Sequence, residues 1–264
     1  PSNRRQLVCL TGGGTAGHVM PHLAVLPLLQ QQGCDVFYVG SENLEQEIMA
    51  PTKIPFYRIS TGKLRRYLSF ENLVDVFRVV IGLGQAFFLL LRKRPQVVFS
   101  KGGYVSVPVC VAAKLLGIPV VTHESDYTPG LANRIIAKVA RKILFAFPDT
   151  GKFLPKGKGH WVGLPVRREV LEGSVEAGKK LCGFESGSGR KVILVMGGSL
   201  GAKAINEAVA AILPDLVKNF DVIHLAGKGK LIDFTSPHYR AFEFLREGYV
   251  DVVAAAAIVV CRPG

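Results

Sequence analysis

The sequence predicts an α/β protein with two doubly wound, Rossmann-like domains. Short β-branched and apolar runs alternate with longer helical patterns along the chain, which is typical of parallel sheets covered by helices on both faces. Two glycine-rich turns, Gly12–His18 and Gly197–Ala202, each follow an apolar run and precede a helical pattern. A chain of 264 residues, 48% of them apolar, is long enough to form two packed cores.

The first domain is expected over residues 1–160. Apolar and β-branched runs bounded by turn residues predict its strands, and longer runs with helical spacing predict its helices. The predicted strands are Gln6–Thr11, Asp35–Val39, Phe56–Ser60, Val97–Ser100, Pro119–Thr122 and Lys142–Phe147. The predicted helices are Val19–Gln32, Ser69–Arg92, Val107–Leu116 and Pro129–Ala140.

A linker is predicted at His160–Arg167, because Gly163 and Pro165 interrupt regular structure there. The second domain is therefore expected over residues 161–264. Its predicted strands are Lys191–Met196, Val222–Ala226, Phe242–Leu245 and Ile258–Cys261, and its predicted helices are Glu176–Cys182, Ala202–Asn219 and Val250–Ala256. A doubly wound domain of this kind usually has more strands, so we expect this second domain to be incomplete.

The net charge of +13 and the pI near 9.7 predict an acidic partner, such as nucleic acid, an anionic membrane or phosphorylated substrates. Basic residues are not interleaved with aromatic ones in any sustained way, so nucleic acid is not expected. The 5 cysteines are widely spaced in apolar runs, which favours buried thiols and a reducing cytoplasm. We expect no signal peptide, no metal site and no cofactor.

Both glycine-rich turns are candidate anion sites, because glycine lets the backbone approach an anion and the following helix points N–H groups at it. Gly12, Gly14 and Gly17 also satisfy the dinucleotide fingerprint, with Glu42 as a candidate ribose-binding acid. A nicotinamide-dependent oxidoreductase is therefore one alternative, and a tight turn without ligand is another. Arg167 is a candidate diphosphate clamp or an ordinary surface arginine.

Polar loops of the first domain are predicted to meet at one edge of the sheet. His18 opens the helix after the first turn, where it is either a general base tuned by a carboxylate or a histidine that only packs or caps. Ser100–Ser106 follows the fourth predicted strand and His123–Asp126 the fifth. The carboxyl edge of a parallel sheet is where open α/β folds bind ligands, so we expect one cleft there.

The predicted helix Ser69–Arg92 is flanked by basic and apolar residues, Lys63–Leu68 before it and Phe87–Arg94 at its end. Polar residues interrupt its apolar stretch too often for it to span a bilayer. An interfacial helix with basic ends is one interpretation, because each Lys or Arg near an anionic surface contributes on the order of 1 kcal/mol. A buried helix with a solvated charged end is the other, and the helical pattern alone favours it.

Several motifs, read together, resemble the MurG family of peptidoglycan N-acetylglucosaminyltransferases. They are Gly12–His18, Lys101–Pro108, His123–Asp126, Gly163–Arg167 and Gly197–Ala202, in this order. The resemblance implies a GT-B fold, with the acceptor on the first domain and UDP-GlcNAc held mainly by the second. It implies inverting transfer of GlcNAc to the 4-hydroxyl of MurNAc in undecaprenyl-diphosphate-MurNAc-pentapeptide, for peptidoglycan synthesis, at the cytoplasmic face of the bacterial membrane. The implied partners are UDP-GlcNAc, this lipid-linked acceptor and an anionic membrane surface.

The same resemblance implies roles for individual residues. His18 is the candidate base, and Asp126 is an alternative base or a partner for His18. Expected substrate contacts on the first domain are Thr15, Ala16, Gly17, Gly102, Gly103 and Tyr104. Those on the second domain are Arg167, Gly198, Ser199, Gly201 and Leu245, the last through its backbone to uracil.

The chain also departs from the family pattern. Many members carry Gln-Asn at Ser125-Asp126 and Gln at Leu200, although one branch has the variants seen here, so we expect no loss of activity from them. Members continue past Gly264 with further donor contacts, so we expect these 264 residues alone to bind UDP-GlcNAc weakly and to turn over slowly or not at all. Another GT-B glycolipid glycosyltransferase and a non-catalytic, membrane-docking fragment remain as alternatives.

Overall fold

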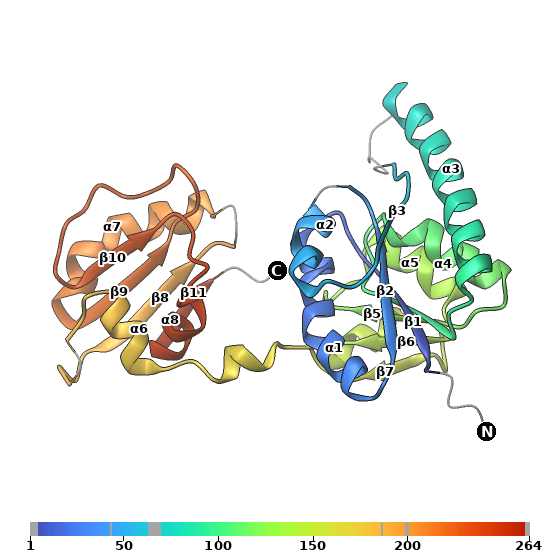
Figure 1. Cartoon of the computed structure of the whole chain (residues 1–264). Coiled ribbons are helices and arrows are strands. Elements are labelled where there is room, and N and C mark those ends of the chain that lie inside the picture. Colours follow the sequence, from blue (N-terminus) through green and yellow to red (C-terminus); the bar gives the residue numbers. More distant parts are fainter. Residues whose placement is uncertain (1–4, 43, 63–69, 186, 199–200, 262–264) are drawn as a thin grey trace. The chain divides into compact units, whose positions relative to one another are not determined.

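The computed structural model describes residues 5–42, 44–62, 70–185, 187–198 and 201–261 (Figure 1). The chain divides into two compact units, Pro1–Val166 and Arg167–Gly264. Each unit is an α/β structure built on its own parallel sheet, so we describe the units separately.

The first unit contains a seven-stranded parallel sheet in the order β3-β2-β1-β4-β5-β6-β7. Its strands are β1 Leu7–Thr11, β2 Asp35–Gly40, β3 Phe56–Arg58, β4 Val97–Ser100, β5 Val120–Glu124, β6 Lys142–Phe145 and β7 Gly159–Trp161. The strand order reverses between β1 and β4, which pair directly through Val8 and Val97. Such a reversal opens a crevice at the carboxyl ends of the strands, so it places the candidate site.

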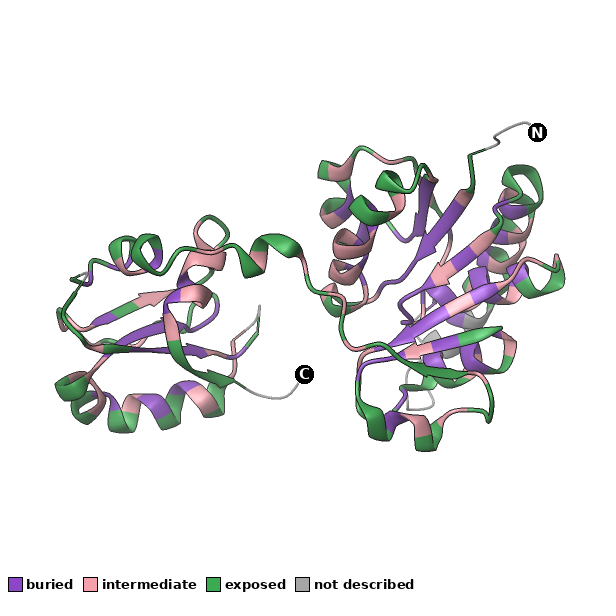
Figure 2. Ribbon diagram, turned by 90° about the horizontal axis from the view of Figure 1, so that it is seen from below, coloured by how far each residue is buried: buried purple, intermediate pink, exposed green. Residues whose placement is uncertain are grey.

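Helices cover both faces of this sheet. They are α1 Met20–Gln31, α2 Leu44–Met49, α3 Phe70–Lys93, α4 Ser106–Leu115 and α5 Leu131–Val139, with short 3-10 turns at Ala16–His18, Ala50–Thr52 and Pro148–Phe153. Successive residues of β1 pack into cores on opposite faces of the sheet, because side chains alternate across a strand. Val8 and Leu10 pack with Tyr38, whereas Cys9 packs with Val98. Figure 2 shows that buried residues, in purple, are common along the strands of this unit.

The second unit contains a four-stranded parallel sheet in the order β10-β9-β8-β11. Its strands are β8 Lys191–Met196, β9 Phe220–Leu225, β10 Tyr239–Phe242 and β11 Ala256–Cys261. Its helices are α6 Val175–Leu181, α7 Lys203–Asn219 and α8 Tyr249–Ala255, preceded by a 3-10 turn at Arg168–Leu171. The apolar side chains of α8 and of α7 belong to two separate cores, which both include residues of β8.

Some elements differ from the sequence prediction. The strand predicted at Phe242–Leu245 lies earlier, because buried Tyr239 starts the pairing with β9, which ends at Phe242 opposite Leu225. The first two residues of the predicted linker, His160 and Trp161, belong to the edge strand β7. All of β7 is exposed, so the sequence has no apolar pattern from which this strand could be predicted. Helix α2 was also not predicted, and it carries Glu45.

Candidate active site

The first glycine-rich turn interlocks with the loop that follows β4. The backbone N–H of Gly13 donates to the carbonyl oxygen of Gly102 at 3.3 Å. Gly103 has φ of +80°, and a Cβ added there would clash with the carbonyl oxygen of Gly13. The ring of Tyr104 covers Gly14, where a Cβ would clash with it. Glycine is therefore needed at Gly103 for the close approach of two backbone segments and at Gly14 for the ring of Tyr104, independently of any ligand.

A buried carboxylate occupies the inner side of this turn. Glu45 is 1% exposed, and its Oε1 accepts a hydrogen bond from the N–H of Gly14 at 2.6 Å. Its Oε2 accepts one from the hydroxyl of Ser41, also at 2.6 Å. The N–H of Gly14 thus has a partner within the protein, and the prediction that this turn binds an anion concerns its remaining N–H groups. Glu42, the candidate ribose-binding acid, pairs with Arg58 at the surface at 2.8 Å.

His18 ends the 3-10 turn that follows the glycines, at the carboxyl edge of the sheet. Its Nδ1 lies 2.9 Å from the hydroxyl oxygen of Thr15. Burial lowers the pKa of His18, the carboxylate of Asp126 opposes this shift, and the ammonium of Lys101 adds to it. The imidazole is therefore held neutral near pH 7, the state that a general base requires.

Lys101 lies at the centre of a buried hydrogen-bond network. Its Nζ donates to Nδ1 of His123 at 2.6 Å and to the hydroxyl oxygen of Ser125 at 2.5 Å. Nε2 of His123 then donates to the carbonyl oxygen of Gly163 at 2.8 Å. Desolvation lowers the pKa of Lys101 to about 8 and that of His123 to about 4. Lys101 is 1% exposed, so it is not a solvated loop charge, and it joins the loops after β4 and β5 to the segment that leaves the first unit.

The loop after β5 is shaped by Glu124, which is also buried. Its Oε1 accepts from the N–H of Asp126 at 2.9 Å, and its Oε2 accepts from the side-chain amide of Asn133 at 2.7 Å. Asn133 in turn lies against Gly102, which has φ of +84°. Glu124 thus turns the chain so that the exposed Asp126 faces the same edge as His18.

In the second unit, Gly197 and Gly198 follow β8, and Gly201 precedes α7. The predicted contact Ser199 and its neighbour Leu200 lie outside the described residues. Gly201 has φ of +68°, and a Cβ there would clash with the carbonyl oxygen of Ala226 after β9. This second turn is therefore also pressed against a neighbouring loop.

A buried polar chain missed by the sequence reasoning holds α7 in place beside this turn. The side-chain amide of Asn206 donates to the carbonyl oxygen of Ala226 at 2.9 Å. Its Oδ1 lies 3.1 Å from Nε2 of His224, whose Nδ1 is 3.1 Å from the hydroxyl of Tyr239. A histidine inside a strand and an asparagine in the first turn of a helix were the available signals, and neither distinguishes a structural from a binding role.

The other two predicted donor contacts, Arg167 and Leu245, also belong to the second unit. Arg167 is partly exposed, and its guanidinium lies 3.8 Å from the carboxylate of Glu169. Leu245 follows β10 at the carboxyl end of the sheet, and its side chain packs against the core beneath α8. Arg167 is thus accessible, with an exposed carboxylate as its partner.

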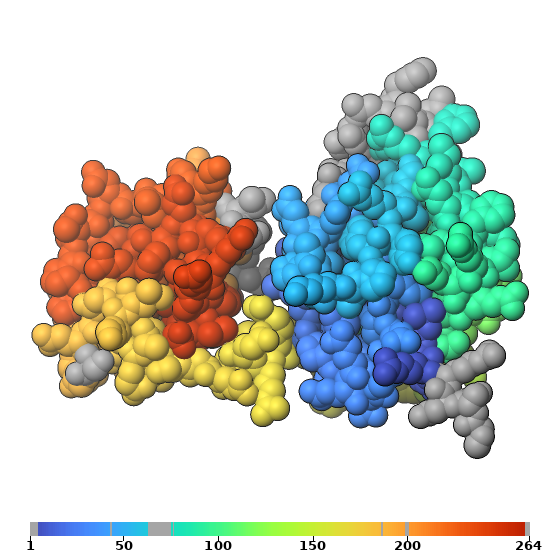
Figure 3. Space-filling view, viewed as in Figure 1, coloured from blue at the N-terminus to red at the C-terminus, as the bar shows by residue number. Residues whose placement is uncertain are grey.

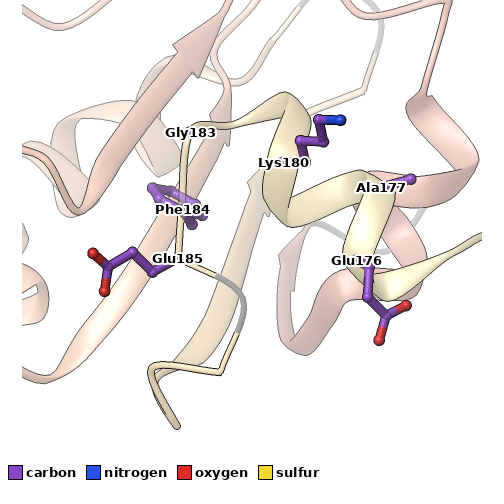
Figure 4. Close-up of a pocket in the computed structure, with 6 residues that line it drawn as sticks. All are labelled: Glu176, Ala177, Lys180, Gly183, Phe184 and Glu185. Carbon is purple, nitrogen blue, oxygen red and sulfur yellow. The ribbon is translucent and has the colours of Figure 1, made fainter.

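Within the described ranges, no group of three or more His, Cys, Asp or Glu side chains is arranged to hold a metal ion. A surface hollow beside α6 gathers none of the predicted site residues (Figure 4). It is lined by Glu176, Ala177, Lys180, Gly183, Phe184 and Glu185. The two carboxylates point away from the ammonium of Lys180 in this view, so the hollow has no convergent polar groups.

Comparison with known protein families identifies the family of this chain. Residues 8–145 match the glycosyltransferase family 28 N-terminal domain, and residues 192–264 match the glycosyltransferase family 28 C-terminal domain. The chain belongs to glycosyltransferase family 28. The first match contains the loops of His18, Lys101 and Asp126, and the second contains the turn at Gly197.

Two relatives of this family 28 chain carry the same enzyme name. A protein of Lachnospira eligens is 50% identical over 97% of this chain and 73% of its own length. A protein of Geobacillus thermodenitrificans is 48% identical over 98% of this chain and 74% of its own. Both are named UDP-N-acetylglucosamine--N-acetylmuramyl-(pentapeptide) pyrophosphoryl-undecaprenol N-acetylglucosamine transferase.

A solved structure agrees with this family. The crystal structure of MurG from Acinetobacter baumannii matches with a TM-score of 0.70 and 27% identity, over 98% of this chain and 74% of that one. Two Rossmann-like units with parallel sheets are the architecture of GT-B glycosyltransferases. The predicted fold class and the predicted transferase family are therefore confirmed.

Proposed function

We propose that this family 28 protein transfers GlcNAc from UDP-GlcNAc to the 4-hydroxyl of MurNAc in undecaprenyl-diphosphate-MurNAc-pentapeptide, the step from lipid I to lipid II in peptidoglycan synthesis. The observation that carries this proposal is the 44–50% identity, over nearly the whole chain, to relatives that bear this enzyme's name. The arrangement of His18, Lys101 and Asp126 at one sheet edge supports it, because it offers a neutral base beside polar loops.

In this proposal His18 is the general base. When Nδ1–H donates to the Thr15 hydroxyl oxygen, Nε2 is the nitrogen that accepts the proton of the attacking MurNAc hydroxyl. The Asp126 carboxylate favours the imidazolium that forms, since it acts to raise the pKa of His18. Asp126 as the base itself is the alternative. Thr15, Ala16, Gly17, Gly102, Gly103 and Tyr104 line the acceptor side.

The second unit binds the donor in this proposal. Gly198 and Gly201 lie at the turn before α7, whose N-terminal N–H groups favour the negative charge that develops on the leaving UDP. Ser199, between them in the sequence, is a further expected donor contact. Arg167 contributes a guanidinium to the diphosphate, and the backbone at Leu245 meets the uracil. The exposed position of Gly198 supports access by a ligand.

The function is tested by incubating the protein that carries this sequence with radiolabelled UDP-GlcNAc and lipid I bearing a shortened polyprenyl chain. We expect a labelled product with the mass of lipid II, and no product with UDP-glucose. Polyprenyl diphosphate without MurNAc and diacylglycerol serve as control acceptors. Transfer to either at a similar rate would favour a different GT-B glycolipid transferase. Tight binding of NADH would favour the oxidoreductase.

We further propose that α3 docks the protein on an anionic membrane, which would place it at the cytoplasmic face. No described helix is long and apolar enough to cross a bilayer. On α3, however, Phe77, Val80, Ile81 and Phe88 recur at helical spacing and are more than half exposed, and Arg92–Arg94 at its end is exposed as well. Figure 3 shows α3 at the surface of the first unit, in turquoise and green. An apolar row ending in cations is typical of interfacial helices.

Replacing Phe77, Ile81 and Phe88 together by serine is therefore expected to weaken binding to liposomes containing anionic lipid by about tenfold or more. The reason is that the variant has less apolar surface to bury in the membrane. Sedimentation of protein with liposomes measures this binding. Leu28→Ser removes a similarly exposed leucine, 61% accessible, from α1 and is expected to have no effect. Equal sedimentation of the triple variant and the wild type would contradict the docking proposal.

A further inference from the structure

We propose that Asn206 is a positioning residue for the donor: its side-chain amide, held by His224, fixes the loop after β9 against the second glycine-rich turn. This inference rests on the proposed function, in which that turn binds the diphosphate of UDP-GlcNAc. Asn206 touches no reacting group in this scheme and acts through the carbonyl oxygen of Ala226.

The second glycine-rich turn packs closely against the loop that follows β9. Gly201 has φ of +68°, and a Cβ added there would clash with the carbonyl oxygen of Ala226 and lie 3.0 Å from Cα of Gly227. Gly227 itself has φ of +93°. The two backbones are thus in direct contact, which glycine permits. The place of this part of the turn therefore depends on the place of the loop.

Asn206 joins the two sides of this contact. Its backbone N–H donates to the carbonyl oxygen of Ala202, the residue after Gly201, at 3.0 Å. Its side-chain amide donates to the carbonyl oxygen of Ala226 at 2.9 Å. The loop is also held by the end of β10, because the N–H of Ala226 donates to the carbonyl oxygen of Phe242 at 2.9 Å. One side chain thus connects the start of α7 to a loop that the sheet already holds.

The N-cap residue of α7, Ala202, has no polar side chain, and no acidic residue lies in the first turn of this helix. A hydroxyl or carboxylate at the N-cap would occupy N–H groups of that turn. Without one, these groups can face an anion. The end of the helix is instead held from inside by Asn206, which is only 7% exposed.

The partners of Asn206 determine how its amide is oriented. A carbonyl oxygen only accepts, so the amide nitrogen faces Ala226 and Oδ1 faces His224. Nε2 of His224, 3.1 Å from this Oδ1, must then carry the proton. Burial lowers the pKa of His224, so near pH 7 the ring is neutral and its Nδ1 accepts from the hydroxyl of Tyr239 at 3.1 Å. The hydrogen bonds therefore run in one direction, from Tyr239 to Ala226.

This polar chain lies in a core where apolar side chains also pack, since Tyr239 belongs to the same cluster as Val195 and Val209. Removing polar groups from water has a cost that apolar side chains of similar size do not incur. A fully hydrogen-bonded chain specifies one arrangement in return. What it specifies here is the position of the Ala226 carbonyl oxygen, which lies against Gly201.

The direction of the hydrogen bonds is tested by ¹⁵N NMR of the protein that carries this sequence, at pH 7 and without ligand, with His224→Gln identifying the signals of His224. We expect the proton on Nε2 and none on Nδ1. A proton on Nδ1 would refute the scheme, because the amide oxygen of Asn206 would then face the carbonyl oxygen of Ala226. This measurement does not depend on transferase activity.

The positioning is tested with Asn206→Leu, which has a side chain of similar size without hydrogen-bonding groups. We expect the KM for UDP-GlcNAc to rise by about five- to fiftyfold, with kcat and the KM for lipid I within about threefold of the wild type, because donor binding alone is weakened. Asn219→Leu is the matched control, since it makes the same change at the exposed last residue of α7, and it should alter none of these constants. A wild-type KM for UDP-GlcNAc in Asn206→Leu would overturn the positioning role, whether or not kcat falls.

Titration of UDP by calorimetry separates this inference from the proposed function. We expect Asn206→Leu to bind UDP at least about fivefold more weakly than the wild type and Asn219→Leu do. Equal affinities in the three proteins, with lipid II formed by the wild type, would contradict the positioning alone. A wild type that neither forms lipid II nor binds UDP would contradict the proposed function and this inference together. If Asn206→Leu does not fold, Asn206→Ala replaces it with the same outcomes.

Discussion

Replacing His18 with alanine is expected to lower kcat for GlcNAc transfer by about 10²- to 10⁴-fold, which is the usual contribution of a general base. The side chain is only partly buried, and among the described residues its hydrogen-bond partner is the hydroxyl of Thr15, so the fold should tolerate the change. Transfer of radiolabelled GlcNAc measures the effect, and thermal unfolding checks the fold. Thr15→Val is the matched variant, because it removes the orienting hydroxyl and retains the base. It should lower kcat less than His18→Ala does.

The pH profile tests the same assignment. The neutral imidazole is the active form, so activity is present above the pKa of His18 and is lost as the pH falls through it. Because burial lowers this pKa, the acidic limb should lie below the ordinary histidine value of about 6.5. Asp126→Asn removes the carboxylate that opposes the shift, so the limb should move to still lower pH. Near-normal transfer by His18→Ala, with none by Asp126→Asn, would make Asp126 the base.

Replacing Gly103 with alanine is expected to destabilise the first unit by roughly 3 kcal/mol or more. The positive φ alone costs a non-glycine residue about 1–2 kcal/mol, and the new Cβ would also clash with the carbonyl oxygen of Gly13. Gly117→Ala is the matched control, because Gly117 has φ of +71° but nothing within 4 Å of an added Cβ. It should lose only about 1 kcal/mol.

Urea denaturation of both variants, followed by circular dichroism, measures this difference as a change in the free energy of unfolding. Equal losses for Gly103→Ala and Gly117→Ala would show that the clash with Gly13 relaxes freely. The interlocking of the two loops would then contribute little to the stability of the site.

The sequence predicted the parts of the fold that depend on repeated local patterns. Buried strands such as Leu7–Thr11 and Lys191–Met196 are continuous apolar runs, so their positions were evident. The exposed strand β7 and the short helix α2 carry no such pattern. The edge of the sheet at which the candidate residues meet was predictable, because parallel strands end on the same side.

The partners of individual site residues were not predictable. Glu45 lies 31 residues from Gly14 in the chain, and Lys101 lies 22 from His123. These contacts depend on the order of the strands and on a helix that the sequence did not reveal. From the sequence alone, a charged residue outside a predicted strand or helix is expected to be exposed to solvent. For this reason Glu45 was not predicted as a site residue, and an exposed position remained an alternative for Lys101.

The close packing of Gly13 against Gly103 also constrains how this sequence can evolve. A side chain at Gly103 would need the space of the Gly13 carbonyl, and one at Gly13 would need the space of the Glu45 carboxylate. A second substitution at the partner glycine therefore cannot rescue the first, since it adds a second clash and leaves the first one in place. Relatives that keep this loop packing should retain both glycines. A lineage that loses Gly103 must widen the separation between the ends of β1 and β4, whereas one that loses Gly13 must move or replace the side chain of Glu45.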